Sequence, residues 1–155
     1  MKNTSQASFL PVVHELARTY QAFEQFASQH IRQLGLTPPQ FDVVATLGHS
    51  KGMNCKELSD RTLITKGTLT GVIDRLEDKG LVTRTMQPND RRSVFVSLTQ
   101  HGERLFDQAF PAHIDYMQIA FKRFGEHDLS GFCQELGRLR EGFSLALEEQ
   151  EEITA

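Results

Sequence analysis

Two short stretches of the sequence carry side chains that could bind a polyanion. The first is Asp90-Arg91-Arg92, which stands just before the β-patterned run 94–98. Arginine presents a planar fork of N–H donors that suits phosphate and guanine. A pair of arginines beside a turn can enter a narrow minor groove, where the potential is most negative. Because DNA repels a carboxylate, we expect Asp90 to bond within the turn or to orient an arginine.

The second stretch, residues 65–78, combines small hydroxyl residues and glycines with two basic side chains. Threonine can hydrogen-bond bases or phosphates, or place its methyl group against that of thymine. Lys66 stands at a helix start, where phosphate is favoured, and Arg75 could reach phosphate or guanine. The residues that this stretch offers to duplex DNA are Thr65, Lys66, Gly67, Thr68, Thr70, Gly71 and Arg75.

Charge is unevenly distributed along the 155 residues, which have a net charge of −3. Residues 61–92 carry seven Lys or Arg and four Asp or Glu, a net of +3, so the rest sums to −6. A local basic segment in an acidic chain fits an anionic partner bound at one place. On charge alone, chance fluctuation of a few residues explains the pattern equally well.

Apolar residues at helical spacing predict a long first helix and a shorter second one. The first extends from about Phe9 to Leu34 and ends at a glycine. Thr37 is the expected N-cap of the second, with Gln40 in the capping-box position and a proline at the first helical position. The second helix continues to about Gly48, with the following residues directed inward: Phe41, Val44, Ala45 and Leu47.

Two helices and a β-ribbon are expected in the centre. Asn54 caps a short helix, and Thr65 caps another that ends at Gly80. The apolar stripe of the second of these helices consists of Leu69, Val72, Ile73 and Leu76. Strands 82–86 and 94–98 follow, joined by a turn at 88–92.

This order describes a winged helix-turn-helix, whose second helix lies in the major groove of DNA. The alternative for the hairpin is an ordinary polar turn with solvated arginines. That alternative becomes the weaker one once a helix-turn-helix directly precedes the hairpin.

The terminal helices carry more apolar surface than the centre can cover. Phenylalanines recur at three- and four-residue steps after Thr99, in a helix that Pro111 should kink, and a last helix begins near Asp128. Their natural cover is each other and the same helices of a second subunit, so we expect a homodimer. The fold class is mainly α with a small β-hairpin wing. The expected domains are a dimerisation region (9–34 and 99–148), a DNA-binding winged helix-turn-helix (37–98) and an acidic tail (149–155).

Three segments resemble the MarR family of bacterial transcription regulators. They are LTPPQFDVVATL (36–47), ELSDRTLITKGTLTGVIDRLEDKGLVTR (57–84) and DRRSVFVSLTQHG (90–102). The family's leucine-x-x-lysine/arginine-glycine-leucine-valine-x-arginine motif stands at 76–84, and its aspartate-x-arginine wing at 90–92. By this pattern Arg92 is the wing arginine and Asp90 its partner. Gly67 and Gly71 depart from the pattern, because the family often carries serine and a longer polar residue there.

The resemblance implies a repressor that binds a pseudo-palindromic operator as an obligate homodimer, with the first, fifth and sixth helices interlocked. It also implies release by a small phenolic or lipophilic effector, by thiol oxidation or by a metal. The aromatic residues of the first and fifth helices that could line an effector cleft are Tyr20, Phe23, Phe26, Phe106, Phe110 and Tyr116. For each of them, a place in the dimer core is the alternative.

Other functions find little support in the residues. There is no nucleophile elbow, phosphate loop, paired-carboxylate site or metal quartet, so we expect neither an enzyme nor a cofactor. The six histidines form no metal-ligand pair, and most of them are expected at the surface or an interface. A thiol-sensing role for Cys55 stays open beside that of a plain small residue, and Cys133 is expected to pack.

The chain shows no membrane span and no apolar run of a signal peptide at its start, which predicts a cytoplasmic protein. A winged-helix module that contacts proteins without reading DNA remains the alternative function.

Overall fold

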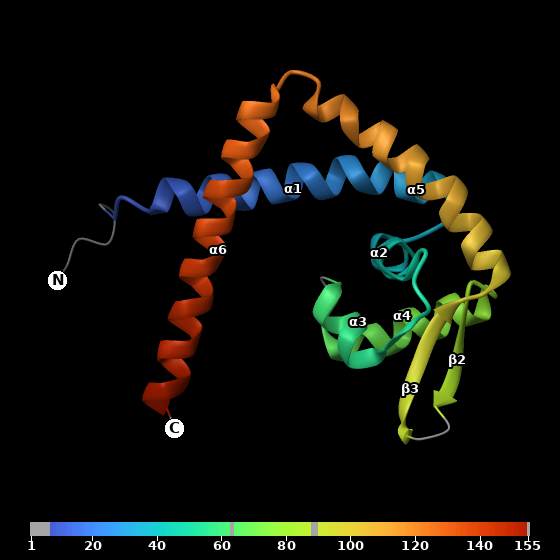
Figure 1. Ribbon diagram of the computed structural model, residues 1–155. Coiled ribbons are helices and arrows are strands. Elements are labelled where there is room, and N and C mark those ends of the chain that lie inside the picture. Colours follow the sequence, from blue (N-terminus) through green and yellow to red (C-terminus); the bar gives the residue numbers. More distant parts are fainter. Residues whose placement is uncertain (1–6, 63, 88–89, 155) are drawn as a thin grey trace. The chain divides into compact units, whose positions relative to one another are not determined.

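The computed structural model describes residues 7–62, 64–87 and 90–154, without the side chains of Gln87, 90–93 and Thr154. The described chain is mainly helical, with a small antiparallel sheet (Figure 1), as the sequence predicted. Its helices are α1 (Leu10–Gln33), α2 (Pro38–Leu47), α3 (Cys55–Arg61), α4 (Lys66–Asp78), α5 (Gln100–Phe121) and α6 (Glu126–Thr154). Its strands are β1 (Met53–Asn54), β2 (Val82–Gln87) and β3 (Asp90–Leu98).

The chain divides into two compact units, residues 1–116 and 117–155. The first unit contains α1 to α4, the sheet and most of α5. The second contains the end of α5 and all of α6. Within the described residues of each, no helix is long and apolar enough to cross a membrane.

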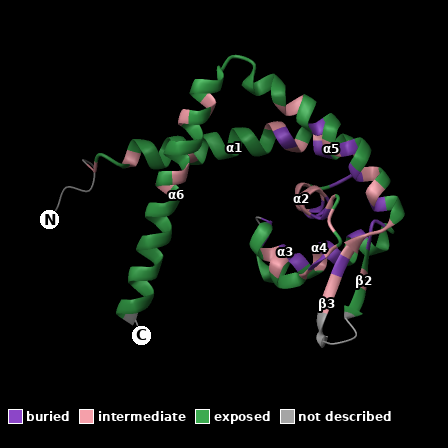
Figure 2. Ribbon diagram, in the orientation of Figure 1, coloured by how far each residue is buried: buried purple, intermediate pink, exposed green. Residues whose placement is uncertain are grey.

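The core of the first unit lies where α2, α3 and α4 meet the sheet, and it contains most of the buried residues in Figure 2. Its largest fully buried side chains are Leu47, Leu58, Ile73, Leu76, Val43, Val44, Val82 and Val96. The predicted stripe of α4 is wholly buried. Burying each such side chain contributes about 1.5–3 kcal/mol, so the stripe fixes which face of α4 remains outside.

The helix starts follow local signals that the sequence predicted. Gln40 Oε1 accepts from the backbone N–H of Thr37 at 3.1 Å, and Asn54 Oδ1 accepts from that of Glu57 at 2.8 Å. Gln40 is only 4% exposed, and its Oε1 also accepts from Lys79 Nζ at 3.2 Å. The capping residue of α2 therefore also anchors the end of α4.

The sheet has three strands in the order β1-β3-β2. β2 pairs antiparallel with β3, with Arg84 opposite Val96, and β1 pairs with the other edge of β3 at Met53. The sequence predicted the β2–β3 hairpin but not β1. A two-residue strand has no periodicity of its own, and its partner lies more than forty residues further along the chain.

The first turn of α5 is tied to the end of α4. Thr99 Oγ1 accepts from the backbone N–H of Gly102 at 3.0 Å and donates to the carbonyl oxygen of Gly80 at 2.6 Å. A Cβ at Gly102 would stand 2.0 Å from the carbonyl oxygen of Leu81, so this contact requires glycine. The wing and α5 therefore leave α4 at a defined junction.

The terminal helices differ in detail from the prediction. Pro111 lies inside α5, which is assigned as one helix, and the kink expected there stays a prediction. α6 begins at Glu126, two residues before the predicted start, because Asp128 Oδ2 accepts from the backbone N–H of Gly125 at 3.0 Å. Asp128 is therefore a capping acceptor inside the first turn. The helix continues to Thr154, so the acidic segment predicted as a tail is helical over 149–154.

Candidate nucleic-acid interface and ligand cavity

The outer face of α4 carries the residues predicted to contact DNA. Thr65 is the N-cap, and its hydroxyl donates to Thr68 Oγ1 at 3.2 Å. Gly71 is half-buried, and the other predicted residues of α4 and its cap are exposed: Thr65, Lys66, Gly67, Thr68, Thr70 and Arg75. The burial of the apolar stripe therefore directs a face of hydroxyls, glycines and two cations outward.

Nothing among the described residues requires glycine at positions 67 and 71. A Cβ built at either position meets no heavy atom within 4 Å, and neither residue has a positive φ. Glycine costs about 1 kcal/mol relative to alanine in a helix interior. The part of the fold that the structure describes therefore gains nothing from glycine at these positions, and the space beside them is open.

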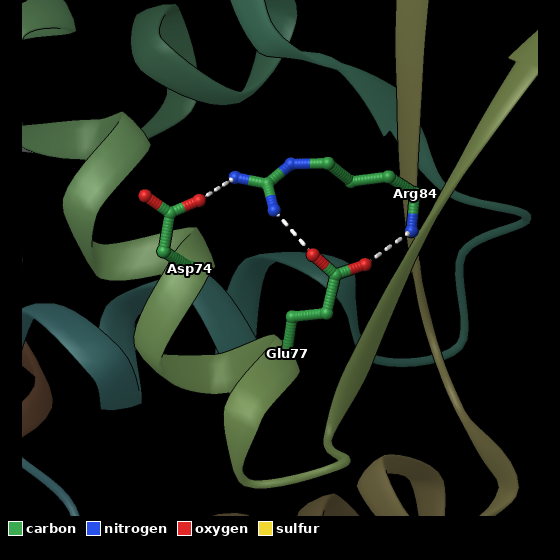
Figure 3. Close-up of polar contacts among 3 residues, drawn as sticks. All are labelled: Asp74, Glu77 and Arg84. Atoms are coloured by element: carbon green, nitrogen blue, oxygen red, sulfur yellow. Dashed lines mark hydrogen bonds and ion pairs between the residues drawn. The ribbon is translucent and has the colours of Figure 1, made fainter.

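Arg84 of β2 joins the wing to α4 through two carboxylates (Figure 3). Its guanidinium donates to Asp74 and to Glu77, and its backbone N–H donates to Glu77 Oε1 at 3.3 Å. Partial burial opposes the charge, but these hydrogen bonds and the two nearby carboxylates raise the pKa of Arg84 above its usual value. Arg84 thus offsets acidic charge on α4 and fixes the helix against β2. The sequence showed Arg84 only as part of a motif, without this role.

The strand β3 begins earlier than predicted. It starts at Asp90, which pairs with Gln87, so residues 90–92 belong to the strand and not to the turn. The regular antiparallel ladder ends where Met86 faces Val94, and a register shift between Met86 and Gln87 separates it from the Gln87–Asp90 pair. The side chains of Asp90, Arg91 and Arg92 lie outside the described residues, and their DNA contacts stay a prediction.

A partly open cavity of about 420 Å³ lies in the first unit. Its lining comes from α1, α2, Ile64 and one residue of α5: Tyr20, Phe23, Glu24, Ala27, Ser28, Ile31, Pro38, Pro39, Phe41, Asp42, Ala45, Ile64 and His113. Two of the six aromatic residues predicted for an effector cleft, Tyr20 and Phe23, are among them.

The other four stack on one another in pairs, within α5 or between α1 and α5. Phe26 stacks on Tyr116 with ring centroids 4.4 Å apart, and Phe106 stacks on Phe110 at 5.1 Å.

The half-buried His30 of α1 and the buried His113 of α5 form a pair, and His113 also lines the cavity. Their Nδ1 atoms are 3.2 Å apart, and His113 is only 7% exposed. Burial, and then the charge of His30, lowers the pKa of His113 below its usual value of 6.5. His113 is therefore an exception to the prediction that most histidines lie at the surface or an interface. No local pattern in the sequence marks the pair, because its members are 83 residues apart.

The two cysteines and the possible metal ligands form no site among the described residues. Both cysteines are free and exposed. Cys133 was expected to pack, but in the single chain it does not. Cys55 is the first residue of α3, directly after its N-cap. Among the residues that the structure describes, no three His, Cys, Asp or Glu side chains are grouped as a metal site.

Comparison with known proteins decides the family. A model of the MarR family matches residues 36–94. The transcriptional regulator MhqR of Bacillus subtilis is 35% identical over 121 residues, which cover 78% of this chain and 83% of the relative. The chain belongs to the MarR family.

Other MarR-type relatives extend the likeness. The homoprotocatechuate degradative operon repressor of Escherichia coli is 31% identical over 124 residues, covering 79% of this chain and 81% of the repressor. A solved structure of Bordetella bronchiseptica BpsR, described as regulated in its DNA binding by 6-hydroxynicotinic acid, is 28% identical with a TM-score of 0.75. It covers 84% of this chain and 98% of that protein. The relatives of this MarR-family chain are thus regulators and repressors of transcription.

Proposed function

We propose that this protein is a ligand-responsive repressor that binds a pseudo-palindromic DNA operator as a homodimer. The observation that carries the proposal is the outer face of α4. Hydroxyl groups, two cations and two glycines with open space at their Cβ positions lie together there, and the buried apolar stripe holds the helix in that orientation. The likeness to BpsR, whose DNA binding is the subject of its structure, supports the assignment.

In the proposed complex α4 enters the major groove by its N-terminal half. The glycines allow close approach, Thr68 and Thr70 contact base edges or phosphates, and Lys66 contacts a phosphate at the helix start. Arg75 reaches a phosphate or a guanine. Arg92 of the wing enters the adjacent minor groove, and Arg91 stands next to it in the sequence.

The proposed homodimer uses the apolar side chains that the single chain leaves uncovered. At the start of α1 these include Phe9, Val12 and Val13, and on α6 they include Phe132, Leu136 and Phe143, all more than 40% exposed. Exposed apolar side chains that recur on one face of a helix are typical of an interface. Two copies related by a two-fold axis would present two α4 helices to successive major grooves, roughly 34 Å apart.

A small lipophilic or phenolic effector would act on the spacing of those helices. A ligand that binds better to a dimer with a different spacing shifts the population towards it and weakens DNA binding. The cavity in the first unit is the proposed place for the ligand, since its volume lies in the usual range for small-molecule sites.

The test is a salt titration of DNA binding by fluorescence anisotropy, using duplexes from the region upstream of the protein's own gene. Wild type should lose affinity steeply as salt rises, because bound phosphates release counterions. Arg92→Ala should weaken binding about tenfold and lower the salt slope by about one. Arg138→Ala, which removes an exposed arginine of α6, is the matched control and should change neither.

Two results would count against the proposal. An unchanged affinity and slope for Arg92→Ala would remove the wing from the interface. Absence of salt-dependent DNA affinity in the wild type would favour a winged-helix module that contacts proteins.

A further inference from the structure

The charged side chains that line the cavity of the first unit are all acidic. Two carboxylic acids, Glu24 of α1 and Asp42 of α2, belong to its lining. None of the lining residues in the described part of the chain is a lysine or an arginine. The charged side chains that a ligand meets in this lining are therefore both acidic.

The remaining polar groups of the lining add no positive charge at neutral pH. The hydroxyl of Tyr20 donates to Glu24 Oε1 at 3.0 Å, and this hydrogen bond is the main reason that the pKa of Tyr20 is raised. His113 is neutral at pH 7, because burial and its neighbour His30 lower its pKa. Tyr20 thus holds one oxygen of Glu24 in place at the cavity.

The apolar part of the lining is rich in aromatic rings. Tyr20, Phe23 and Phe41 line the cavity, and the ring of Phe41 lies 4.6 Å from that of His113. The face of such a ring carries partial negative charge and attracts a cation within about 6 Å. Rings beside carboxylates suit an apolar molecule with a positive charge, and they disfavour a carboxylate of the same shape.

We propose that the cavity binds a lipophilic organic cation, such as an aromatic quaternary ammonium compound, as the effector that releases the protein from DNA. The inference rests on the proposed ligand-responsive function and narrows it to one charge class. It sets this chain apart from BpsR, whose described regulator is a carboxylic acid. Glu24 and Asp42 are the groups that select the charge, and the aromatic rings hold the apolar body.

The test compares three probes of nearly the same shape by calorimetric titration of the full chain without DNA. They are 4-phenylbutyl-trimethylammonium, its neutral analogue with carbon in place of nitrogen, and the anion 5-phenylpentanoate. The cation should bind at least tenfold more tightly than the anion, with the neutral analogue between them. The cation's advantage should shrink as salt rises, since screening weakens exposed charges.

Variants then assign the preference to residues. Glu24→Gln keeps an oxygen for Tyr20 but removes the charge, and it should weaken cation binding about three- to fivefold, as expected for an exposed pair. The double variant with Asp42→Asn should lose most of the preference. Glu15→Gln, an exposed glutamate of α1 that does not line the cavity, is the matched control and should bind as wild type does.

Three outcomes would overturn the inference. They are equal binding of the three probes, tighter binding of the anion, or a cation that binds without weakening DNA affinity. Because the titration uses protein without DNA, it decides the charge preference even if no operator is bound. A DNA complex released by the anion but not by the cation would leave the proposed function standing and refute only the choice of ligand.

Discussion

At the scale of single residues, Gly67 and Gly71 separate stability from function. Alanine is preferred to glycine by about 0.5–1 kcal/mol inside a helix, and an added Cβ meets nothing here. We expect Gly71→Ala to raise the free energy of unfolding by about that amount, with a smaller gain for Gly67→Ala in the first turn, as measured by urea titration. Both variants should weaken DNA binding, because their methyl groups would stand between α4 and the groove.

A substitution that raises stability and weakens DNA binding cannot act through unfolding. Gly131→Ala is the control for helix propensity, since Gly131 lies equally open on α6. Gly131→Ala should raise the free energy of unfolding and leave DNA affinity unchanged, because Gly131 is not on α4. Unchanged DNA affinity in Gly67→Ala and Gly71→Ala would show that this face of α4 does not approach DNA closely.

His113 should make stability fall in mild acid. Its pKa is lowered in the folded chain, so the unfolded chain binds the proton more readily. The stabilisation is complete above the unfolded value of about 6.5 and is lost as pH falls below it towards the folded value. His113→Gln should therefore lose less stability than wild type between pH 7.5 and 5.5, measured by urea unfolding. Parallel pH profiles for the two proteins would contradict this assignment.

The contact between His30 and His113 could not be predicted from the sequence. Each histidine looked like a polar residue on an amphipathic helix, and only folding brings their Nδ1 atoms to 3.2 Å. The same holds for the cavity, where Tyr20 and Phe23 were predicted but Glu24 and Asp42 were not. Aromatic content is visible in a sequence, whereas the charge that lines a cavity depends on contacts between distant elements.

At the scale of elements, Arg84 is the link between the wing and α4. Arg84→Met should reduce stability by no more than about 1 kcal/mol, since the carboxylates of Asp74 and Glu77 are 58% and 42% exposed. Its effect on DNA binding should be larger, about tenfold, because two carboxylates near the groove would no longer be offset. Fluorescence anisotropy with a fixed duplex measures the loss.

A triple variant distinguishes this role from a direct DNA contact. Adding Asp74→Asn and Glu77→Gln to Arg84→Met removes the charges that Arg84 offsets, so affinity should recover most of the loss. A triple variant as weak as Arg84→Met alone would mean that Arg84 itself contacts DNA. Such a cycle is informative because the three residues are in direct contact.

Elements were predictable wherever their signal is local. The capping residues Thr37 and Asn54 and the apolar stripe of α4 act within a few residues of chain, and each was predicted. The start of β3 was not, because a turn-rich composition extends past the point where pairing begins at Asp90. β1 was also missed, since it exists only through its pairing with β3.

At the scale of the whole molecule, the single chain leaves apolar surface that water disfavours. No described residue of α6 is buried, and its Phe132, Leu136 and Phe143 are each about half exposed. These positions follow helical steps and share one face. Since the unit that contains α6 does not bury this stripe, we infer that a second copy of the chain covers it, as the sequence analysis expects.

Leu136→Asp tests the stripe at its centre. Burying an unpaired carboxylate in an interface costs several kcal/mol, so the variant should sediment as a monomer at micromolar concentration while wild type sediments as a dimer. Helical content by circular dichroism should stay near wild type, because Leu136 is 56% exposed in the single chain. DNA affinity should fall more than tenfold, since one subunit contacts only one half-site. Gln134→Asp, which adds the same charge at an exposed polar position of α6, should remain dimeric. A dimeric Leu136→Asp would place the subunit contact elsewhere and would leave the exposed stripe of α6 to another partner.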